Sequence, residues 1–488
     1  MDSRLLRQLQ RPELYAHPVT AFEVIETHIS WVLLTGTYAY KFRKPVNLGF
    51  LDFSSLELRH RDCLEELRLN RRLADPLYLG LTRITATSDG PAVDGDGPVL
   101  EYAVRMVQFP QAQLLSQLEP AGGVTPAMIH ALAQRLATFH QSLPPAPASS
   151  DWGTMSVLQE VIGQNFTQVR AHADDPALTI DLDALEVWSA AQLERLRPLL
   201  QRRRSAGAVR ECHGDLHLGN IVLWHDQPLP FDCIEFTPRY RWVDTLNDLA
   251  FLLMDLEFRQ RAPLARVLLD HYLAQRGDYT GVALLPLFKS YRAMVRAKVA
   301  LLGEDPQRRA LAQRYIQLAS SYRQHSRAAL CLMHGISGSG KSWQSAQLLA
   351  REDAVRLRSD VERKRLFPER SQRYSEAANR ATYHQLLQLT EQLLDQQIAV
   401  IVDAAFLRQT QRAPFIQAAQ QRGLTIRIYV CEAPRELRQQ RIEARLRMGQ
   451  DPSDATLAVM RQQEQLCQPL TAQEAPLAVY PDQESGFA

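Results

Sequence analysis

The sequence predicts two domains of different class: an α+β domain of two lobes, then an α/β domain with a parallel sheet flanked by helices. Three observations favour this arrangement. The chain has 488 residues, too many for one ordinary core. Residues 211–236 form a strand-like run, a polar loop, a hairpin and another apolar run, and a glycine-rich loop near residue 335 lies between strand-like and helical patterns. We expect domains at 1–326, with lobes dividing near residue 110, and at 327–488.

The composition is that of a globular protein, with 45% hydrophobic and 23% charged residues. A net charge of +2, from 56 basic and 54 acidic residues, creates no field that would favour extended nucleic acid or a membrane surface as partner. The six cysteines include no C-x-x-C pair, which indicates buried thiols in a reducing compartment. No apolar run approaches the roughly 20 residues of a membrane span. We therefore expect a soluble cytoplasmic protein.

The polar loop within residues 211–236 carries His213, Asp215 and Asn220, and Asp232 follows the hairpin. Asp215 is the candidate acceptor of a proton from a substrate hydroxyl. Asn220 and Asp232 are the candidates to hold Mg²⁺ against nucleotide phosphates, because hard cations prefer oxygen ligands. A polar turn between buried strands is the alternative. The ordered set H-x-D-x4-N, followed by an Asp on an apolar run, argues against it.

This spacing resembles the catalytic loop and metal-binding Asp of protein kinases, with HGD in place of HRD. The segment HGDLHLGN resembles more closely the aminoglycoside and choline phosphotransferase branch of that superfamily. The resemblance implies a protein-kinase-like bilobal domain that uses ATP. In that fold, Tyr102–Phe109 would be the edge strand and hinge that hold an adenine ring.

Two strand-like runs flank Thr35-Gly36-Thr37, which predicts a tight antiparallel turn. By the kinase resemblance, this turn lies over the phosphates and a lysine on the next strand contacts them. Lys41 is the candidate, with Lys44 as the alternative. Glu66, on the following predicted helix, would pair with that lysine, and Glu65 is its competitor.

Several charged residues follow Asp232. We expect Asp248 to brace the catalytic loop, and Arg241 to flank the substrate. Lys289, Arg292 and Arg296 recur at helical spacing and form a basic stripe. The stripe is interpreted either as a solvated or docking face, or as a site for a phosphorylated or carboxylated acceptor.

The second domain opens with G-x4-G-K-S between an apolar strand and a helix. In this motif backbone N–H groups and the helix N-terminus surround the phosphates. The Lys reaches the β- and γ-oxygens, and the Ser hydroxyl is a ligand of Mg²⁺. The predicted phosphate-binding residues are Gly335, Ser337, Gly338, Ser339, Gly340, Lys341 and Ser342.

A second strand ends at Asp360, and Arg363 follows three residues later. This S-D-x-x-R arrangement resembles P-loop kinases that act on hydroxyls, such as the polynucleotide-kinase and zeta-toxin groups. The resemblance implies that Asp360 accepts the acceptor's proton and that Arg363 binds the acceptor. Asp403 ends a buried strand and is interpreted as the carboxylate near Mg²⁺. Ala405 stands where that family has Thr, so no hydroxyl acts at this position.

Arg441 and Arg445 lie four residues apart on a predicted helix. On one face they would form a lid over the transferred phosphoryl group and stabilise its charge. The alternative is a solvated charged helix in which Glu436 and Glu443 are the partners of these arginines.

Together the halves resemble a bacterial fusion of an aminoglycoside-phosphotransferase-like kinase with a P-loop kinase of the predicted-kinase group. The resemblance implies a bifunctional enzyme that uses ATP and Mg²⁺ to phosphorylate a hydroxyl of a small molecule, such as a sugar or nucleoside-like metabolite. Two alternatives stay open. In the first alternative, only one half is a kinase and the other is a regulatory ATP-binding module. In the second, the C-terminal half phosphorylates a nucleic-acid end.

Overall fold

The computed structural model divides into two compact units. The first unit comprises Met1–Asp255 and Tyr291–Gln313, and the second comprises Leu256–Ser290 and Arg314–Ala488. The sequence boundary predicted after residue 326 falls beside residues 325–326, outside the described part, and stays a prediction. The structure describes residues 2–47, 51–172, 176–302, 306–324, 327–373, 375–448 and 456–480.

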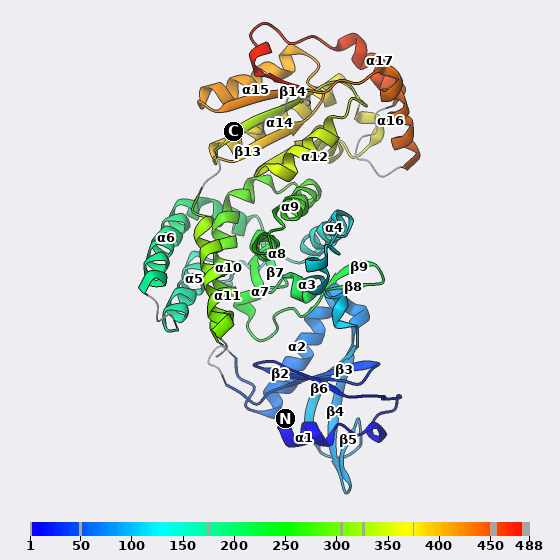
Figure 1. Cartoon of the computed structure of the whole chain (residues 1–488), viewed down its shortest axis with the longest axis vertical. Helices are drawn as coiled ribbons and strands as arrows, with labels where there is room; N and C mark the ends of the chain where they lie inside the picture. The colour runs from blue at the N-terminus through cyan, green and yellow to red at the C-terminus, as the bar shows by residue number, and fades with distance from the viewer. Residues whose placement is uncertain are drawn as a thin grey trace. The chain divides into compact units, whose positions relative to one another are not determined.

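The small lobe of the first unit is a six-stranded antiparallel sheet in the order β1-β2-β3-β6-β4-β5 (Figure 1). The tight turn predicted at residues 35–37 joins β2 to β3. The expectation of an edge strand at residues 102–109 is wrong, because β6 pairs with β3 on one side and β4 on the other. The strands are β1 Glu23–Glu26, β2 Ser30–Leu34, β3 Tyr38–Arg43, β4 Tyr78–Thr87, β5 Gly90–Val93 and β6 Val99–Val107.

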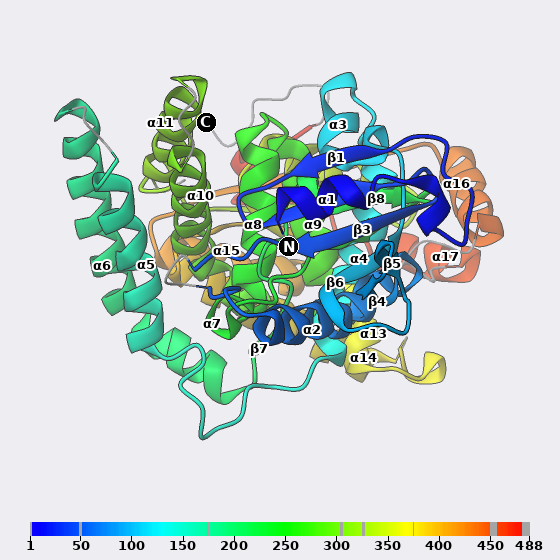
Figure 2. The same cartoon turned by 90° about the horizontal axis from the view of Figure 1, so that it is seen from below.

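Helices α1 (Ser3–Gln8) and α2 (Leu56–Ala74) cover opposite faces of this sheet (Figure 2). On the α1 face, Leu6 packs in one cluster with Tyr40 and Phe42. On the α2 face, Cys63 and Leu67 pack with apolar residues of β3 and β6. Since side chains alternate along a strand, β3 contributes Ala39 to the core on the α2 face and Tyr40 and Phe42 to the core on the α1 face.

The large lobe is mainly helical, with two short antiparallel strand pairs, β7–β10 and β8–β9. The β8–β9 hairpin is the one predicted after the catalytic loop. Within the described ranges, no helix has the length and apolar character needed to cross a bilayer. The elements are α3 Leu115–Leu118, α4 Pro126–Ser142, α5 Met155–Arg170, α6 Pro176–Ser205, β7 Val209–Glu211, β8 Ile221–Trp224, β9 Gln227–Pro230, α7 Pro238–Arg241, β10 Trp242–Asp244, α8 Thr245–Phe258, α10 Leu285–Leu301 and α11 Pro306–Ser321.

The second unit contains a parallel sheet, as the sequence predicts, and its strands lie in the order β12-β13-β11-β14-β15. Helices α9 and α12 pack against each other and against β12, while α14 and α15 pack against each other and contact β13 and β14, respectively. The elements are α9 Ala262–Arg276, β11 Ala329–His334, α12 Lys341–Arg351, β12 Ala354–Arg358, α13 Ser359–Leu366, α14 Glu376–Asp395, β13 Ala399–Asp403, α15 Gln409–Gln421, β14 Thr425–Val430, α16 Arg435–Met448, α17 Leu457–Leu466 and β15 Ala478–Val479.

A buried ion pair fixes α9 to the sheet of the second unit. The Arg356 guanidinium, on β12, donates to both carboxylate oxygens of Asp270 at 3.1 and 2.6 Å. The same guanidinium donates to Ser345 Oγ at 3.1 Å, which places the pair directly behind the phosphate-binding loop. The helix α9 is therefore an integral part of this unit, although it precedes the P-loop by about sixty residues.

We expect Arg356→Met to destabilise the second unit by about 3–5 kcal/mol, because it leaves the Asp270 carboxylate buried without its cation. The double variant Arg356→Met/Asp270→Leu should recover most of this loss. Urea denaturation of the full chain measures both. Arg422→Met, which breaks a pair with the largely exposed Asp395, is the control and should cost less than about 1 kcal/mol. Equal effects of the two single substitutions would contradict the role of the buried pair.

Candidate active sites

In the first unit, Lys41 on β3 pairs with Glu66 on α2, with Nζ and Oε1 2.8 Å apart. The same Nζ lies 2.5 Å from Asp232 Oδ1. Burial opposes the charge on Lys41, but Asp232 and Glu66 overcome that effect and raise the pKa of the lysine well above its usual range. The predicted ion pair is thus present, and it brings β3, α2 and the loop after β9 to one point.

The two alternative residues have other partners. Lys44 pairs with Glu26, a largely exposed residue of β1. Glu65 pairs with Arg68 and Arg241. Neither Lys44 nor Glu65 therefore takes part in the lysine–glutamate pair, which Lys41 and Glu66 form.

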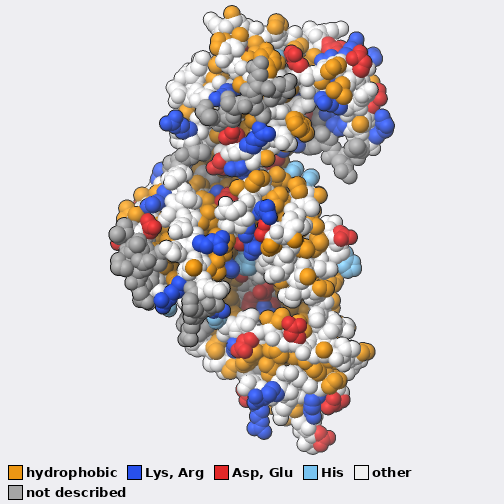
Figure 3. Space-filling model, viewed as in Figure 1, with side chains coloured by type: hydrophobic (Ala, Val, Ile, Leu, Met, Phe, Trp, Pro, Cys, Tyr) orange, Lys and Arg blue, Asp and Glu red, His pale blue; other side chains and the backbone are white. Residues whose placement is uncertain are grey.

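The catalytic loop places Asp215 and Asn220 together. Asn220 Nδ2 donates to Asp215 Oδ2 at 2.9 Å and to the backbone oxygen of Asp215 at 3.0 Å. Burial would raise the pKa of Asp215, but His217 and then Arg296 hold it well below its ordinary value, so the carboxylate is ionised at neutral pH. In the space-filling view the surface is hollowed between the small lobe and the large-lobe helices, with acidic side chains at the bottom (Figure 3).

Asp248 braces this loop as predicted. Its carboxylate accepts the backbone N–H groups of His213 at 3.2 Å and of Gly214 at 2.7 Å. His140 Nε2 lies 3.0 Å from the same carboxylate. Cys212 also lies close enough for the three side chains to hold a metal. Because the Asp248 oxygens already hold the loop, we assign this buried group a structural role.

Arg43, two residues beyond Lys41 on the same face of β3, is a residue that the sequence analysis missed. Its buried guanidinium contacts Asp62 and Glu66 on α2, and Glu235. Lys41 and Arg43 thus meet four carboxylates in one connected cluster, Asp62, Glu66, Asp232 and Glu235. The signal was available as K-x-R on a strand and D-x-x-x-E on a helix, since both spacings keep residues on one face.

Glu235 lies in a buried environment that disfavours its ionised form. Burial raises the pKa of Glu235 to about 8, with Asp62 and Glu66 adding to the shift and Arg43 opposing it. Because Glu235 is mostly protonated at neutral pH, the cluster carries about one surplus negative charge, which a cation near Asp232 would offset.

The turn at residues 35–37 is held by Gln108, just after β6. Its Oε1 accepts the backbone N–H groups of Thr35 at 3.0 Å and Gly36 at 2.8 Å. Only Gly36 in this turn has a positive φ, of 91°. The Gln108 side chain therefore fixes a turn that lacks the several glycines of a protein-kinase loop.

The predicted substrate roles of Arg241 and Arg292 are wrong. Arg241 is 4% exposed and pairs with Glu211 and Glu65. Arg292 is 2% exposed and donates to the backbone oxygen of Gly214 at 2.9 Å. Both cations hold the catalytic loop region from inside the protein, so the spacing of Lys289, Arg292 and Arg296 does not produce an exposed basic stripe.

In the second unit, the loop from Gly335 to Gly340 joins β11 to α12, whose first two residues are Lys341 and Ser342, as the motif predicts. Gly335 and Gly338 have φ values of 145° and 84°. A Cβ at Gly335 would lie 2.3 Å from the Cys431 oxygen, so only glycine fits there. Lys341 Nζ donates to the Ile336 oxygen at 2.9 Å. Burial lowers the pKa of Lys341.

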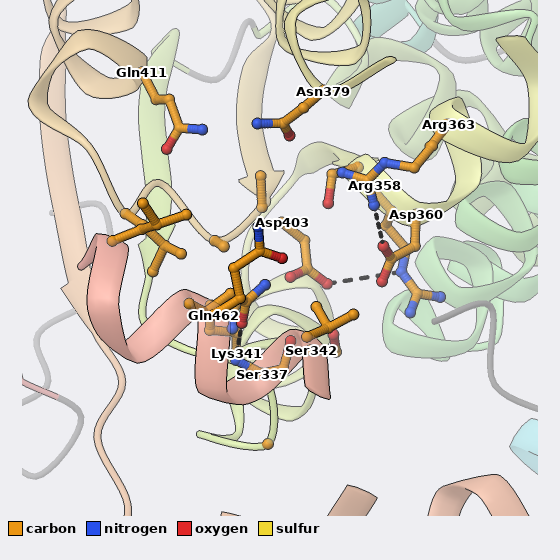
Figure 4. A pocket seen from close by; sticks show the side chains of 18 of the residues that line it. Ser337, Lys341, Ser342, Arg358, Asp360, Arg363, Asn379, Asp403, Gln411 and Gln462 are labelled. Carbon is orange, nitrogen blue, oxygen red and sulfur yellow. Dashed lines mark hydrogen bonds and ion pairs between the residues drawn. The ribbon is translucent and has the colours of Figure 1, made fainter. Parts of the chain in front are cut away.

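Asp403, Asp360 and Arg363 line one pocket with the phosphate-binding loop (Figure 4). Asp403 ends β13 and accepts a hydrogen bond from Ser345 Oγ at 3.1 Å. Asp360 lies in the first turn of α13, just past β12, and pairs with Arg363 at 2.9 Å. The sequence analysis therefore grouped these residues correctly, although β12 ends two residues earlier than expected.

Helices α16 and α17 supply another part of the pocket wall. Arg441 and Arg445 line the pocket, and Arg441 Nη1 donates to the Gly338 oxygen at 3.2 Å. From α17, Gln463 Oε1 accepts the Ser337 N–H at 2.8 Å. The sequence analysis missed Gln463, since nothing local marks it. The position of Arg441 and Arg445 favours the lid interpretation over a wholly solvated helix.

Comparison with known proteins agrees with this architecture. Residues 51–285 match the model of a phosphotransferase enzyme family, and residues 330–470 match an AAA domain model. Uncharacterized proteins of Mycobacterium tuberculosis and Mycobacterium bovis are 31% identical over 460 residues, which covers 91% of this chain and 90% of theirs.

The chain belongs to the family of these mycobacterial proteins. Members of this family resemble this chain across both halves, and here the first half has the phosphotransferase fold and the second a P-loop kinase-like fold.

Solved structures with similar folds have low sequence identity. A GDP complex of aminoglycoside 2'-phosphotransferase-IIIa is 16% identical, with a TM-score of 0.41, over 66% of this chain and 100% of that one. Choline kinase from Cryptosporidium parvum is 12% identical, with a TM-score of 0.41, over 62% and 88%. APS kinase of Mycobacterium tuberculosis, in complex with AMPPNP and APS, is 21% identical, with a TM-score of 0.24, over 32% and 91%.

The raised pKa of Glu235 predicts a pH effect on stability. Between about pH 4.5 and 8 the folded chain holds a proton that the unfolded chain releases, so this group lowers stability as the pH rises. Glu235→Gln keeps an oxygen for Arg43 but cannot ionise. We expect its free energy of unfolding, relative to the parent protein, to increase by at least about 1 kcal/mol between pH 5 and 9 in urea denaturation.

The control is Glu194→Gln, on a largely exposed pair with Arg197, which should show no such gain. If the free energy of unfolding of Glu235→Gln, relative to the parent protein, falls as the pH rises, the raised pKa of Glu235 is wrong.

Proposed function

We propose that the chain is a bifunctional phosphotransferase in which each half binds ATP and Mg²⁺ and transfers the γ-phosphoryl group to a hydroxyl of a small molecule. One observation carries the proposal. Each unit brings together, from distant parts of its sequence, a lysine for phosphates, an oxygen set for a divalent cation and a further carboxylate for the acceptor. Structural roles alone do not require this combination twice on two unrelated folds.

In the first half, Asp215 would accept the proton of the acceptor hydroxyl. Its low pKa keeps it ionised and makes it a weak base, which suits a loose transition state in which the proton leaves late. Lys41, held by Glu66, would orient the nucleotide phosphates. Asp248 and Arg292 keep the loop backbone in place, so Asp215 is positioned before the substrate arrives.

The donor set of the first half fits Mg²⁺. Asn220 directs its Nδ2 to Asp215, which leaves its amide oxygen for a cation beside the carboxylate of Asp232. With Glu235 mostly protonated, two cationic side chains face the three other carboxylates of the adjoining cluster, and this net negative charge would favour a bound cation. When bound, Mg²⁺ would offset charge on the phosphate oxygens.

In the second half, the loop N–H groups and Lys341 would hold the phosphates, with Ser342 and Asp403 as the oxygen donors for Mg²⁺. Asp360 would accept the acceptor's proton while Arg363 orients the acceptor. Arg441 and Arg445 line the same pocket and would stabilise the charge of the transferred group.

One observation favours the second candidate, in which the P-loop half is a regulatory nucleotide-binding module. The Ser337 N–H and the Lys341 ammonium are both bonded within the protein, to Gln463 and to the Ile336 oxygen. Nucleotide binding in this half would therefore require rearrangement, as in a switch.

The test is an ATP-consumption screen of the full chain against metabolites and oligonucleotides. We expect Asp215→Asn and Asp360→Asn each to lower turnover of one acceptor by roughly 10²- to 10⁴-fold, as removal of a general base does, and to leave turnover of the other unchanged.

Asp226→Asn and Asp395→Asn, at exposed positions of the two halves, are matched controls and should keep full activity. If one active-site variant changes nothing with any acceptor, that half is a binding module and the bifunctional proposal is wrong. Turnover of oligonucleotide ends alone by the second half would assign it a nucleic-acid substrate.

A further inference from the structure

The pocket of the second unit extends beyond its phosphate-binding loop. Its volume is about 820 Å³, within the range of roughly 300–1,000 Å³ for small-molecule sites. In Figure 4, Lys341, Ser342 and Ser337 lie together at one end, while the side chains of Asn379 and Gln411 point toward each other at the other end. The phosphate-binding loop therefore occupies only part of the pocket.

The described lining of this pocket is strongly basic. Seven basic side chains face three acidic ones, Asp360, Glu376 and Asp403, a surplus of four positive charges. A triphosphate with bound Mg²⁺ carries about two net negative charges. About two positive charges are left for a second ligand. Besides Lys341, the basic side chains are Arg358, Arg363, Arg373, Arg408, Arg441 and Arg445.

Two of these arginines line the pocket and are bonded to residues outside the phosphate-binding loop. Arg363 extends from α13 and is held by Asp360, the proposed base. Arg408 is the N-cap residue of α15, and its backbone N–H donates to Gln411 Oε1 at 3.0 Å. By contrast, Arg441 bonds the loop itself, at the Gly338 oxygen.

The amides at this end add a second kind of recognition. Asn379 and Gln411 line the pocket from two helices, α14 and α15, and each offers a donor and an acceptor. Amide groups facing each other suit hydroxyl groups, whereas arginines suit phosphates and carboxylates.

We propose that the second half takes as acceptor a small polyhydroxy compound that already carries a phosphate or carboxylate. Arg363 and Arg408 bind the anionic group, and Asn379 and Gln411 bind hydroxyls. The inference rests on the proposed phosphotransferase function of this site. In the reaction, the acceptor oxygen bonds to the γ-phosphorus, the bond from that phosphorus to the β,γ-bridging oxygen breaks, Asp360 takes the hydroxyl proton, and ADP leaves.

The test uses the full chain with Asp215→Asn, so that only the second half transfers phosphate. Acceptors are supplied as matched sets: a sugar, its monophosphate and its aldonate, for several sugars. ADP release is measured with Mg²⁺ and ATP. We expect kcat/KM for an anionic member to exceed that of its neutral partner by at least tenfold. We expect Arg363→Gln and Arg408→Gln each to raise KM for that member about tenfold or more, with the KM for ATP unchanged.

The control Arg422→Gln, outside the pocket, should change neither KM. Equal turnover of neutral and anionic members, or an unchanged acceptor KM in Arg408→Gln, would overturn the inference while the phosphotransferase function stands. If no acceptor is phosphorylated, calorimetry with a non-hydrolysable ATP analogue decides. Selective binding of the anionic members would keep the anionic site and reject the kinase function, and no binding would reject both.

Discussion

The ion pair between Lys41 and Glu66 is the interaction on which the first unit depends. Glu66 is fully buried and contacts both Lys41 and Arg43, so one carboxylate joins β3 to α2. Lys41 continues the chain of contacts to Asp232, and Arg43 continues it to Glu235. A buried charge without its partner is costly, so these segments are constrained to keep their relative positions. The position of the loop after β9 is thereby fixed relative to the small lobe.

In the second unit, a different buried ion pair, Arg356–Asp270, fixes the position of site residues. Arg356 ties the carboxylate of Asp270 to Ser345, which in turn bonds Asp403. The Asp403 carboxylate at the end of β13 is thus oriented by Ser345 on α12, and Ser345 is held by the Arg356–Asp270 pair. In both units the groups that would contact phosphate are supported by buried charges a few ångströms away, as preorganised electrostatic sites require.

Much of this could be predicted from the sequence, because motifs with fixed spacing are local. The motif from Gly335 to Ser342, the hairpin before Asp232 and the Lys41–Glu66 pair follow from periodicity and from known patterns. The roles of Arg241 and Arg292 could not be predicted in this way. A sequence shows that an arginine is present, but whether it is buried depends on partners such as Glu211, thirty residues away. The place of α9 in the second unit depends similarly on Asp270 and Arg356, which are separated by 86 residues.

The hydrogen bond from the Ser337 N–H to Gln463 has a consequence for affinity. A phosphate that uses this N–H must compete with the glutamine, so the apparent affinity is the intrinsic affinity multiplied by the fraction of molecules in which Gln463 has released it. If that fraction is about one in ten, the loss is about 1.4 kcal/mol. A substitution on α17 that weakens this hydrogen bond would therefore raise the apparent affinity for phosphate by up to about the same factor.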